Sequence, residues 1–261
     1  MKRAYVLGLV LAVVAFGVGC DDTEETPVVD AAVTGGAGGA GGAGGAGGAV
    51  DTTESYVITA LGITQPGPPV GIMLRNLLNS NINQQTVIIM LRLTEDTVEG
   101  GAAQYLEGKD TGDPSDDLFT WELEGTCLKA DETTGPCAVE VGSAPITRAA
   151  DGSFASEETV LNIYSADLQA IIRLKKVILS GTVSADGTVT SSIAGVITQP
   201  DAANTPMELV PGSGDYTTLE SVLVNANVEP DVEVDDGTGT MVPAFTLVGS
   251  LEGVSVPFQV Q

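Results

Sequence analysis

The chain has 261 residues, of which 43% are hydrophobic, so wholesale disorder is excluded and one or two domains are expected. Aspartate and glutamate outnumber lysine and arginine by 35 to 10, and the resulting net charge of −25 excludes nucleic-acid binding. The chain contains no histidine, which excludes a Ser-His-Asp triad, a Cys-His nucleophile and histidine-ligated zinc.

The first twenty residues have the layout of an export signal. Lys2 and Arg3 give a positive start, residues 4–16 carry no charge, and small residues lead to Cys20. The apolar stretch is shorter than the roughly 20 residues that span a membrane. We therefore expect residues 1–19 to be a signal peptide, with an uncleaved membrane anchor or an ordinary signal as the alternatives.

The end of this segment resembles the lipobox of bacterial lipoproteins. Cys20 stands at the acylated position, and Gly17 stands where that family usually has leucine or another branched residue. The resemblance implies that Cys20 receives a diacylglycerol and becomes the first residue of the mature chain. It further implies an exported protein of the cell envelope that is anchored by its lipid. We favour the outer membrane or cell surface as the site of the anchor, with the inner membrane as the alternative, because Asp21 after the lipid cysteine resembles a retention signal of enteric bacteria that does not hold across bacterial groups.

Residues 20–50 are predicted to form a tether between the lipid and a folded domain. Residues 35–49 repeat Gly-Gly-Ala five times without a proline, which excludes a collagen helix. A glycine-rich coil of this length has a typical reach on the order of 30 Å. The arrangement resembles the Gly/Ala-rich spacers in lipoproteins of myxobacterium-like bacteria, and this likeness is confined to residues 1–50.

Residues 51–261 are predicted to form a β-rich globular domain. Strand patterns occur in the apolar run 86–93, the alternating segment 119–124, the aliphatic segment 171–183 and two short closing segments, 245–248 and 254–256. Asp186-Gly187 indicates a hairpin turn after the third of these. We expect a mainly β fold, either an antiparallel β-sandwich or an open barrel, with one or two short helices packed on it.

Two segments have helical spacing, and two others are expected to be loops. Val70, Met73, Leu74, Leu77 and Leu78 follow a pair of prolines and share one face, as do Leu219, Val222, Leu223 and Ala226 after Thr218. Both apolar stripes are interpreted as core contacts. The stretches 99–117 and 200–216 are rich in glycine, aspartate and proline and are predicted to be loops.

Cys127 and Cys137 remain as an even pair once Cys20 is acylated. An exported chain meets an oxidising compartment, and a turn-like stretch of nine residues separates the two cysteines. The spacing is not that of a Cys-x-x-Cys redox pair, and no histidine exists to complete a zinc site. We therefore expect a structural disulfide.

A short basic cluster interrupts the aliphatic segment 171–183. Lys175 and Lys176 break the alternation as a β-bulge would. Together with Arg173 they could bind an anionic partner. The favoured interpretation is that they interrupt an aggregation-prone strand and pair with nearby acids.

One acidic loop suggests a calcium site. Asp231, Glu233 and Asp235 alternate along the chain, and Asp236-Gly237 follows, which resembles the Asp-x-Asp-x-Asp-Gly loops that hold calcium through carboxylates. The loop departs from the EF-hand pattern, because Asp236 replaces the required glycine and Val242 replaces the bidentate glutamate. Calcium is the sole cofactor suggested, and a solvated turn is the alternative interpretation.

The sequence favours a non-enzymatic function. It contains no P-loop, and a hydrolase built on paired carboxylates stays open because nothing selects two acids out of 35. The first hypothesis is an envelope binding or structural module displayed on a lipid tether. The alternatives are a carrier of apolar ligands, enclosed between the sheet and the helix near 70–80, and a carboxylate hydrolase. The membrane is the partner that the N-terminus implies, while a protein or small apolar partner stays undefined.

Overall fold

The computed structural model describes residues 53–107, 113–128, 133–208 and 215–260. All of these residues belong to one compact unit, which spans residues 49–261. Its elements are β1 (Glu54–Gln65), α1 (Val70–Asn83), β2 (Ile89–Leu93), β3 (Thr97–Glu107), η1 (Pro114–Asp116), β4 (Leu118–Trp121), β5 (Glu124–Leu128), β6 (Thr134–Ala138), β7 (Gly142–Arg148), β8 (Ser153–Ser156), β9 (Thr159–Ser165), β10 (Ala170–Val183), β11 (Thr188–Thr198), α2 (Gln199–Ala203), β12 (Pro206–Glu208), β13 (Tyr216–Thr218), α3 (Leu219–Asn225), β14 (Val232–Asp235) and β15 (Met241–Ser255).

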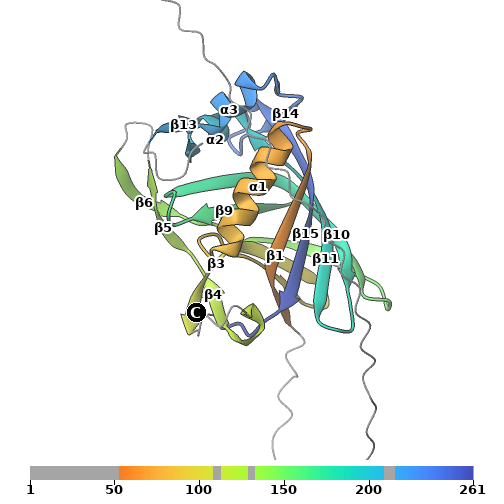
Figure 1. Cartoon of the computed structure of the whole chain (residues 1–261). Coiled ribbons are helices and arrows are strands. Elements are labelled where there is room, and N and C mark those ends of the chain that lie inside the picture. The colour runs from red at the N-terminus through yellow and green to blue at the C-terminus, as the bar shows by residue number, and fades with distance from the viewer. Residues whose placement is uncertain (1–52, 108–112, 129–132, 209–214, 261) are drawn as a thin grey trace, which may run out of the picture. The chain divides into compact units, whose positions relative to one another are not determined.

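Eight of these strands form a closed ring. β1, β2, β3, β7, β8, β10, β11 and β15 are neighbours in that order, and β15 also pairs with β1. All of these pairings are antiparallel. The sheet is therefore a barrel (Figure 1). This confirms the predicted mainly β, antiparallel fold and selects the barrel over the sandwich.

The inside of the barrel is a packed apolar core. In β11, Val189 and Ile193 are buried, while Thr190 and Ser192 between them are exposed, which is the period of two expected of a strand with one buried face. The core continues through all the other ring strands and into α1. Its largest fully buried members include Tyr56, Ile58, Ile89, Leu91, Leu93, Leu161, Leu174, Leu179 and Ile193.

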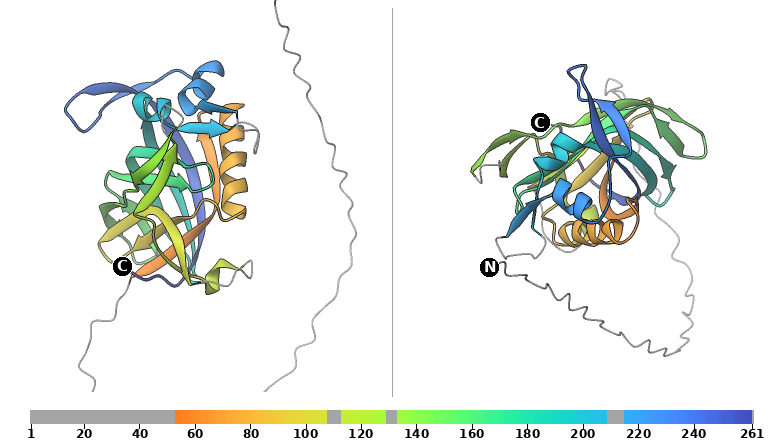
Figure 2. Two further views of the ribbon diagram at one scale, coloured as in Figure 1. Left: turned by 90° about the vertical axis from the view of Figure 1, so that its left-hand side faces the viewer. Right: turned by 90° about the horizontal axis from the view of Figure 1, so that it is seen from above.

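Helix α1 covers a gap in the barrel wall. β2 pairs with β1 only between Glu54 and Val57, so the rest of that edge of β1 has no strand beside it. α1 runs alongside β1 (Figure 2) and buries Leu74 and Leu78 against the core. The Asn79 amide donates from Nδ2 to the Leu61 carbonyl at 2.9 Å and accepts the Leu61 N–H at 2.8 Å. One side chain therefore replaces the missing strand at this point.

A second, smaller core lies on the outer face of β1 to β3. Met90 and Phe119 are fully buried there, beneath β4 and the C-terminal segment. Phe119 donates its N–H to the Pro257 carbonyl at 3.2 Å, and the Phe258 ring lies 5.1 Å from the Trp121 ring. The chain end is thereby fixed against the barrel wall.

Two predicted loops and one strand boundary are wrong. Residues 97–107 form β3. The glycine at position 100 does not mark a turn: a Cβ added there would lie 3.2 Å from side-chain atoms of both Leu91 and Leu161, so glycine is needed for close packing between strands. Within 200–216, most of α2, all of β12 and the start of β13 occupy positions that were expected to be loop, and residues 209–214 lie outside the described residues. The run 86–93 becomes a strand only at Ile89, because the turn that follows α1 extends to Thr86 and Val87 makes only an isolated bridge with Ser165.

The alternating segment 119–124 is a strand only as far as Trp121, and β5 begins at Glu124, so that prediction is wrong beyond β4. Several other expected elements are confirmed. α1 and α3 lie where the helical spacing placed them, and Thr218 caps α3 by accepting the Ser221 N–H at 3.1 Å. The register of β10 shifts between Lys175 and Ile178, which is the predicted bulge. Gly187 has φ 82° in the turn that joins β10 and β11.

Candidate functional site

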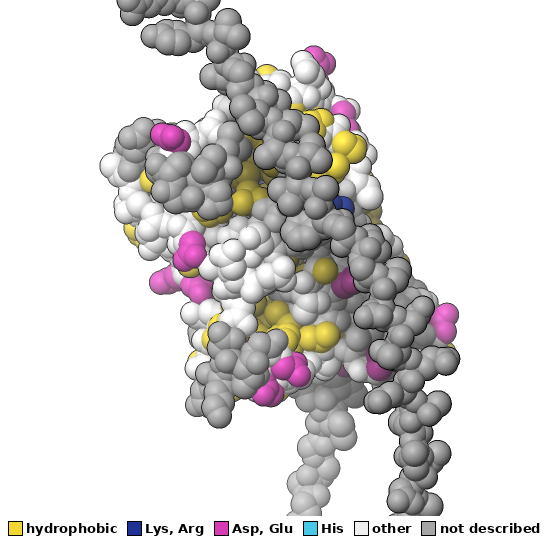
Figure 3. Space-filling view, in the orientation of Figure 1, with side chains coloured by type: hydrophobic (Ala, Val, Ile, Leu, Met, Phe, Trp, Pro, Cys, Tyr) yellow, Lys and Arg dark blue, Asp and Glu magenta, His cyan; other side chains and the backbone are white. Residues whose placement is uncertain are grey.

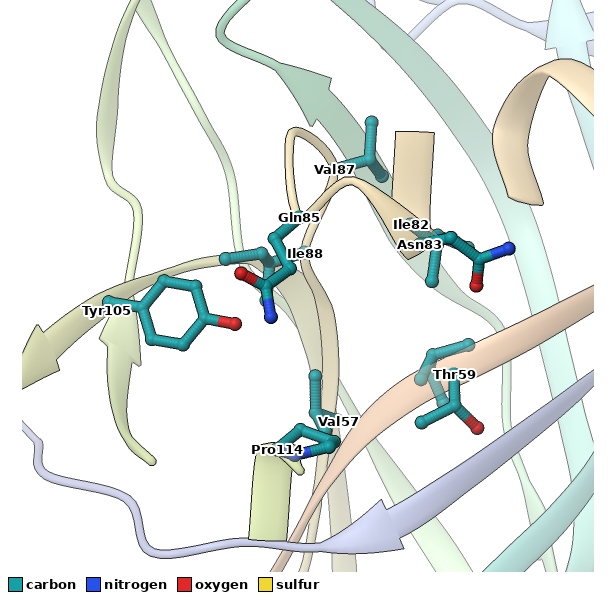
Figure 4. A pocket seen from close by; sticks show the side chains of 10 residues that line it. Val57, Thr59, Ile82, Asn83, Gln85, Val87, Ile88, Tyr105 and Pro114 are labelled. Carbon is teal, nitrogen blue, oxygen red and sulfur yellow. The ribbon is translucent and has the colours of Figure 1, made fainter. Parts of the chain in front are cut away.

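A cavity of about 240 Å³ opens between the C-terminal end of α1, β1 and β3 (Figure 4). The described residues that line it are Val57, Ile58, Thr59, Ile82, Asn83, Gln85, Val87, Ile88, Tyr105 and Pro114. All ten are uncharged, although 17% of the chain is charged. The wall combines aliphatic surface with two amides, one hydroxyl and one phenol, which is the mixture found in sites for small ligands.

Tyr105 is held in place by packing. Its ring centroid lies 4.7 Å from that of Phe119, which is fully buried in the outer core. The hydroxyl points across the cavity towards the side chain of Gln85 (Figure 4). On the opposite wall, Thr59 donates its hydroxyl to the Glu252 carbonyl at 3.3 Å, so β15 orients this group.

The end of α1 places Gln85 in the cavity. The Gln85 N–H donates to the Ile82 carbonyl at 2.9 Å and the Thr86 N–H donates to the Asn81 carbonyl at 3.0 Å, the two bonds that define a Schellman motif. Gln85 has φ 60°, the left-handed conformation of this motif. The motif reverses the chain into β2 and turns the Gln85 side chain away from the helix axis.

A shallower hollow of about 610 Å³ lies beside the hairpin of β5 and β6. The hairpin contains the Cys127–Cys137 disulfide, with a Cα–Cα distance of 5.7 Å, which confirms the predicted bridge. The Tyr164 hydroxyl accepts the Thr126 N–H at 3.0 Å and donates to the Thr126 carbonyl at 3.3 Å. The hairpin is thus cross-linked within itself and held to β9.

Glu122 and Glu124 lie on the rim of this hollow. Burial raises the pKa of the Glu122 carboxyl above its ordinary range.

The four predicted calcium ligands lie on β14 and the turns that flank it. Asp231 accepts the Thr246 N–H at 2.9 Å and the Gln65 side-chain amide at 3.1 Å. Glu233 is exposed on β14, which is the last strand in the sheet order. These two acids are therefore committed to an edge strand and its junction with the barrel.

Asp235 and Asp236 each close a turn of their own. Asp235 accepts the N–H groups of Gly237 and Gly239 at 2.8 and 2.9 Å. Asp236 accepts the N–H and the hydroxyl of Thr238 at 2.8 and 2.7 Å. Across the described ranges, no group of three or more histidine, cysteine, aspartate or glutamate side chains is placed to hold a metal ion. The calcium site stays a prediction.

The Asp236 turn belongs to a recurring pattern. In four described turns, an aspartate carboxylate accepts hydrogen bonds from both the N–H and the hydroxyl of a serine or threonine two residues later. These bonds lower the pKa of the carboxyl. The four residues are Asp113, Asp151, Asp186 and Asp236. Three of them form the tripeptide Asp-Gly-Ser/Thr. Some of the aspartates that give the chain its negative charge therefore stabilise turns.

The basic cluster on β10 forms ion pairs. Lys176 lies 3.0 Å from Glu158, and Lys175 lies 3.4 Å from Asp201 at the start of α2. Lys175 also donates to the Asp236 carbonyl at 3.2 Å. The pairing agrees with the favoured interpretation of the two lysines. Arg173 is half-buried on the same strand, opposite Asn162 of β9.

The space expected for an apolar ligand between α1 and the sheet is filled. Leu77, Leu78, Ile163 and Ile172 surround a void of about 20 Å³, room for about one water molecule. A surface groove of about 250 Å³ separates α1 from α3. None of the helices in the described ranges is long and apolar enough to span a membrane.

The two polar residues that face each other across the cavity, Gln85 and Tyr105, were missed at the level of sequence. Tyr105 lies in a stretch that was expected to be a loop. Gln85 had a signal: Asn83-Gln84-Gln85 ends a helical pattern and leads into a strand without the usual glycine. Cys20, the predicted lipid attachment, lies outside the described residues.

No protein-family model, curated protein or solved structure matches this chain.

Proposed function

We propose that this chain is an exported lipoprotein, in which a lipid on Cys20 anchors a non-enzymatic binding module to the cell envelope. The observation that carries the proposal is the order of the N-terminal sequence: a basic start, an uncharged apolar stretch, small residues and then Cys20. Residues 21–50 would act as a spacer that lets the barrel move tens of ångströms from the membrane. The side cavity at Gln85 and Tyr105 would be the binding site.

The surface of the barrel supports anchoring by lipid. Aspartate and glutamate side chains are spread over the face shown in Figure 3, while lysine and arginine appear in one small spot. With a net charge of −25, the protein is repelled by anionic headgroups. Two acyl chains, whose burial contributes about 0.8 kcal/mol per methylene, would overcome this repulsion.

Substitution of the anchor cysteine tests the proposal. We expect Cys20→Ala to move the protein from the detergent-soluble membrane fraction to the aqueous fraction of cell lysates. Mass spectrometry of the wild type should show a mature chain that begins at Cys20 and carries acyl groups.

The Cys127→Ala/Cys137→Ala double variant is the control, because it removes thiol chemistry elsewhere and should leave the protein in the membrane fraction. A wild-type chain without acyl mass, or Cys20→Ala protein that stays with the membrane, would contradict lipid anchoring.

A further inference from the structure

The hollow beside the hairpin of β5 and β6 is large enough to hold a small molecule. Its volume is about 610 Å³, and sites for small molecules usually measure about 300–1,000 Å³. Two charged side chains line it within the described ranges, and both are carboxylates: Glu122 and Glu124. The cavity beside α1 differs in this respect, because its described lining is uncharged.

Neither carboxylate forms an ion pair with a described residue. The ion pairs of the described ranges join other acids to Arg92, Arg148, Lys175 and Lys176. Glu122 is half-buried, and burial without a nearby positive charge disfavours its ionised form, which is why the pKa of this carboxyl is raised. A cation bound in the hollow would supply the missing charge.

The hairpin adds an apolar surface next to these carboxylates. Glu124 of β5 pairs directly with Ala138 of β6. Thr126 pairs with Pro136 in the same register, and all four residues are exposed. Directly paired residues point to the same face of a sheet, with Cβ atoms about 4.5–5.5 Å apart. One carboxylate and a short carbon surface therefore adjoin on one face of the hairpin.

The wall of the hollow is fixed before a ligand binds. The Tyr164 hydroxyl of β9 accepts the Thr126 N–H at 3.0 Å, and the hairpin lies beside β9 (Figure 1). Gly125 lies against the Tyr164 ring, since a Cβ added there would come within 2.6 Å of it. The Cys127–Cys137 disulfide joins the two strands of the hairpin. A preformed wall spares a ligand the cost of ordering it.

The lining suits an organic cation and not a metal ion. Calcium takes about six to eight oxygen ligands, whereas two carboxylates line this hollow, and no described group of three or more acidic, cysteine or histidine side chains is placed to hold a metal. A diamine could place an ammonium group at each carboxylate and its methylene groups against Pro136 and Ala138. The net charge of −25 attracts cations to the chain.

We propose that this hollow binds an aliphatic diamine and that Glu122 and Glu124 contact its ammonium groups. The inference goes beyond the proposed function, because it adds a second site with a cationic ligand. It is independent of the lipid anchor, which the Cys20 experiment decides separately.

Binding is measured by NMR titration of the full chain in about 0.15 M salt, which screens diffuse attraction beyond about 8 Å. The probes have the same carbon chain and differ in charge: cadaverine is a dication, pentylamine carries one charge and 1,5-pentanediol carries none. We expect cadaverine to shift the amide resonances of Thr126 and Ala138. Pentylamine should bind about tenfold more weakly, and 1,5-pentanediol and magnesium at the same concentration should leave these resonances in place.

Three variants separate the hollow from the general negative charge. Glu122→Gln and Glu124→Gln each remove one carboxylate at nearly constant shape and should weaken cadaverine binding by about tenfold and fivefold. Glu252→Gln, at an exposed position on β15, removes the same charge elsewhere and should leave the affinity unchanged.

A further variant blocks the site while keeping both carboxylates. Ala138→Lys places an ammonium group opposite Glu124, at an exposed position where the longer side chain can be accommodated. We expect it to weaken cadaverine binding at least about tenfold, because its own cation takes the place of the ligand.

Any of three results would overturn the inference. The first is equal shifts at Thr126 and Ala138 with cadaverine and magnesium, or no shift with cadaverine. The second is an equal loss of affinity in Glu252→Gln and Glu122→Gln, which would mean that the charge of the whole chain attracts the diamine. The third is cadaverine binding that is unchanged in Ala138→Lys, which would place the contacts outside the hollow.

Discussion

Asn79 shows how a single side chain can complete a sheet. Its amide offers one donor and one acceptor at the spacing of a peptide group, and both are used by the backbone of Leu61 on the open edge of β1. An unpaired backbone group at this half-buried position would cost about 1–3 kcal/mol. The residue therefore serves the same purpose as a ninth strand would.

We expect Asn79→Ala to lower the free energy of unfolding by about 2 kcal/mol, because it leaves both Leu61 groups without their partner. Urea denaturation of the two proteins measures the difference. Asn76→Ala is the matched control, since Asn76 lies on the exposed face of the same helix. Equal losses in the two variants would mean that helix propensity, and not the edge of β1, sets the effect.

Tyr56 brings an ionisable group into the barrel core. It is 2% exposed, and its hydroxyl donates to Glu54 at 3.2 Å, while Arg148 forms an ion pair with the same carboxylate at 2.6 Å. Burial, and secondly the negative charge of Glu54, raise the pKa of the phenol well above its usual range. The folded chain therefore holds the phenol neutral at pH values where an unfolded chain ionises it.

The stability that depends on this phenol is fully present below the unfolded pKa of about 10 and is lost as the pH rises above it, because the unfolded chain ionises first. Between pH 10 and pH 11, we expect the free energy of unfolding of the wild type to fall by about 1 kcal/mol more than that of Tyr56→Phe. Denaturant titrations at each pH measure this difference. Tyr216→Phe, at an exposed position, should behave like the wild type. Parallel pH profiles for wild type and Tyr56→Phe would exclude the effect.

At the scale of elements, the alternating acids of β14 have a structural explanation. β14 is the terminal strand of the sheet order, so one of its edges offers unpaired backbone groups. Glu233 and Asp235 lie on it two residues apart, which is the period of a strand, and Asp231 immediately precedes it. Like charges along an exposed edge oppose pairing with a second copy of the chain.

We expect Glu233→Val to promote edge-to-edge association, because it extends the apolar pair Val232 and Val234 and removes a repelling charge. Sedimentation velocity over a range of concentrations should show a dimer or larger species that the wild type lacks. Glu229→Val, at an exposed position before the strand, controls for the loss of one charge. A monomer at all concentrations would assign the alternation to another cause.

Elements defined by local signals could be predicted, and elements defined by distant contacts could not. The β10–β11 hairpin follows from Asp186-Gly187 between alternating arms, and α3 follows from Thr218 and its apolar stripe. β3 was predicted to be a loop because its glycines resemble turn residues in the sequence. Gly100 is needed instead because Leu91 of β2 and Leu161 of β9 pack against it, and the sequence does not show those contacts. The cavity could not be predicted either, because Tyr105 lies on β3, which was expected to be a loop, and because the left-handed backbone conformation that turns Gln85 into the cavity is set by the end of α1.

At the scale of the whole molecule, the acidic excess governs the response to ions. Asp231, Asp235 and Asp236 each accept hydrogen bonds within separate local structures. The whole chain carries a net charge of −25, and salt screens such a charge over a length of about 8 Å at physiological ionic strength. General screening is therefore the expected effect of a divalent cation.

We expect calcium and magnesium at matched ionic strength to raise the melting temperature equally, because both screen the same repulsion. Thermal unfolding in each ion and in chelator measures the shifts. A rise specific to calcium, abolished by Asp231→Asn with Asp235→Asn, would contradict this expectation and establish the site that the loop sequence suggested.

The pairing of β1 with β15 joins the first strand of the domain to the last. Tyr56 pairs with Ser255, and the Val256 N–H donates to the Ser55 carbonyl at 2.9 Å, so the ring cannot close before residues 255 and 256 have been synthesised. Contacts of such long sequence separation make folding slow, on the scale of milliseconds to seconds. A nascent chain that lacks its final strand stays open along both edges. For the proposed export, this topology would keep the barrel open until Ser255 has crossed the membrane.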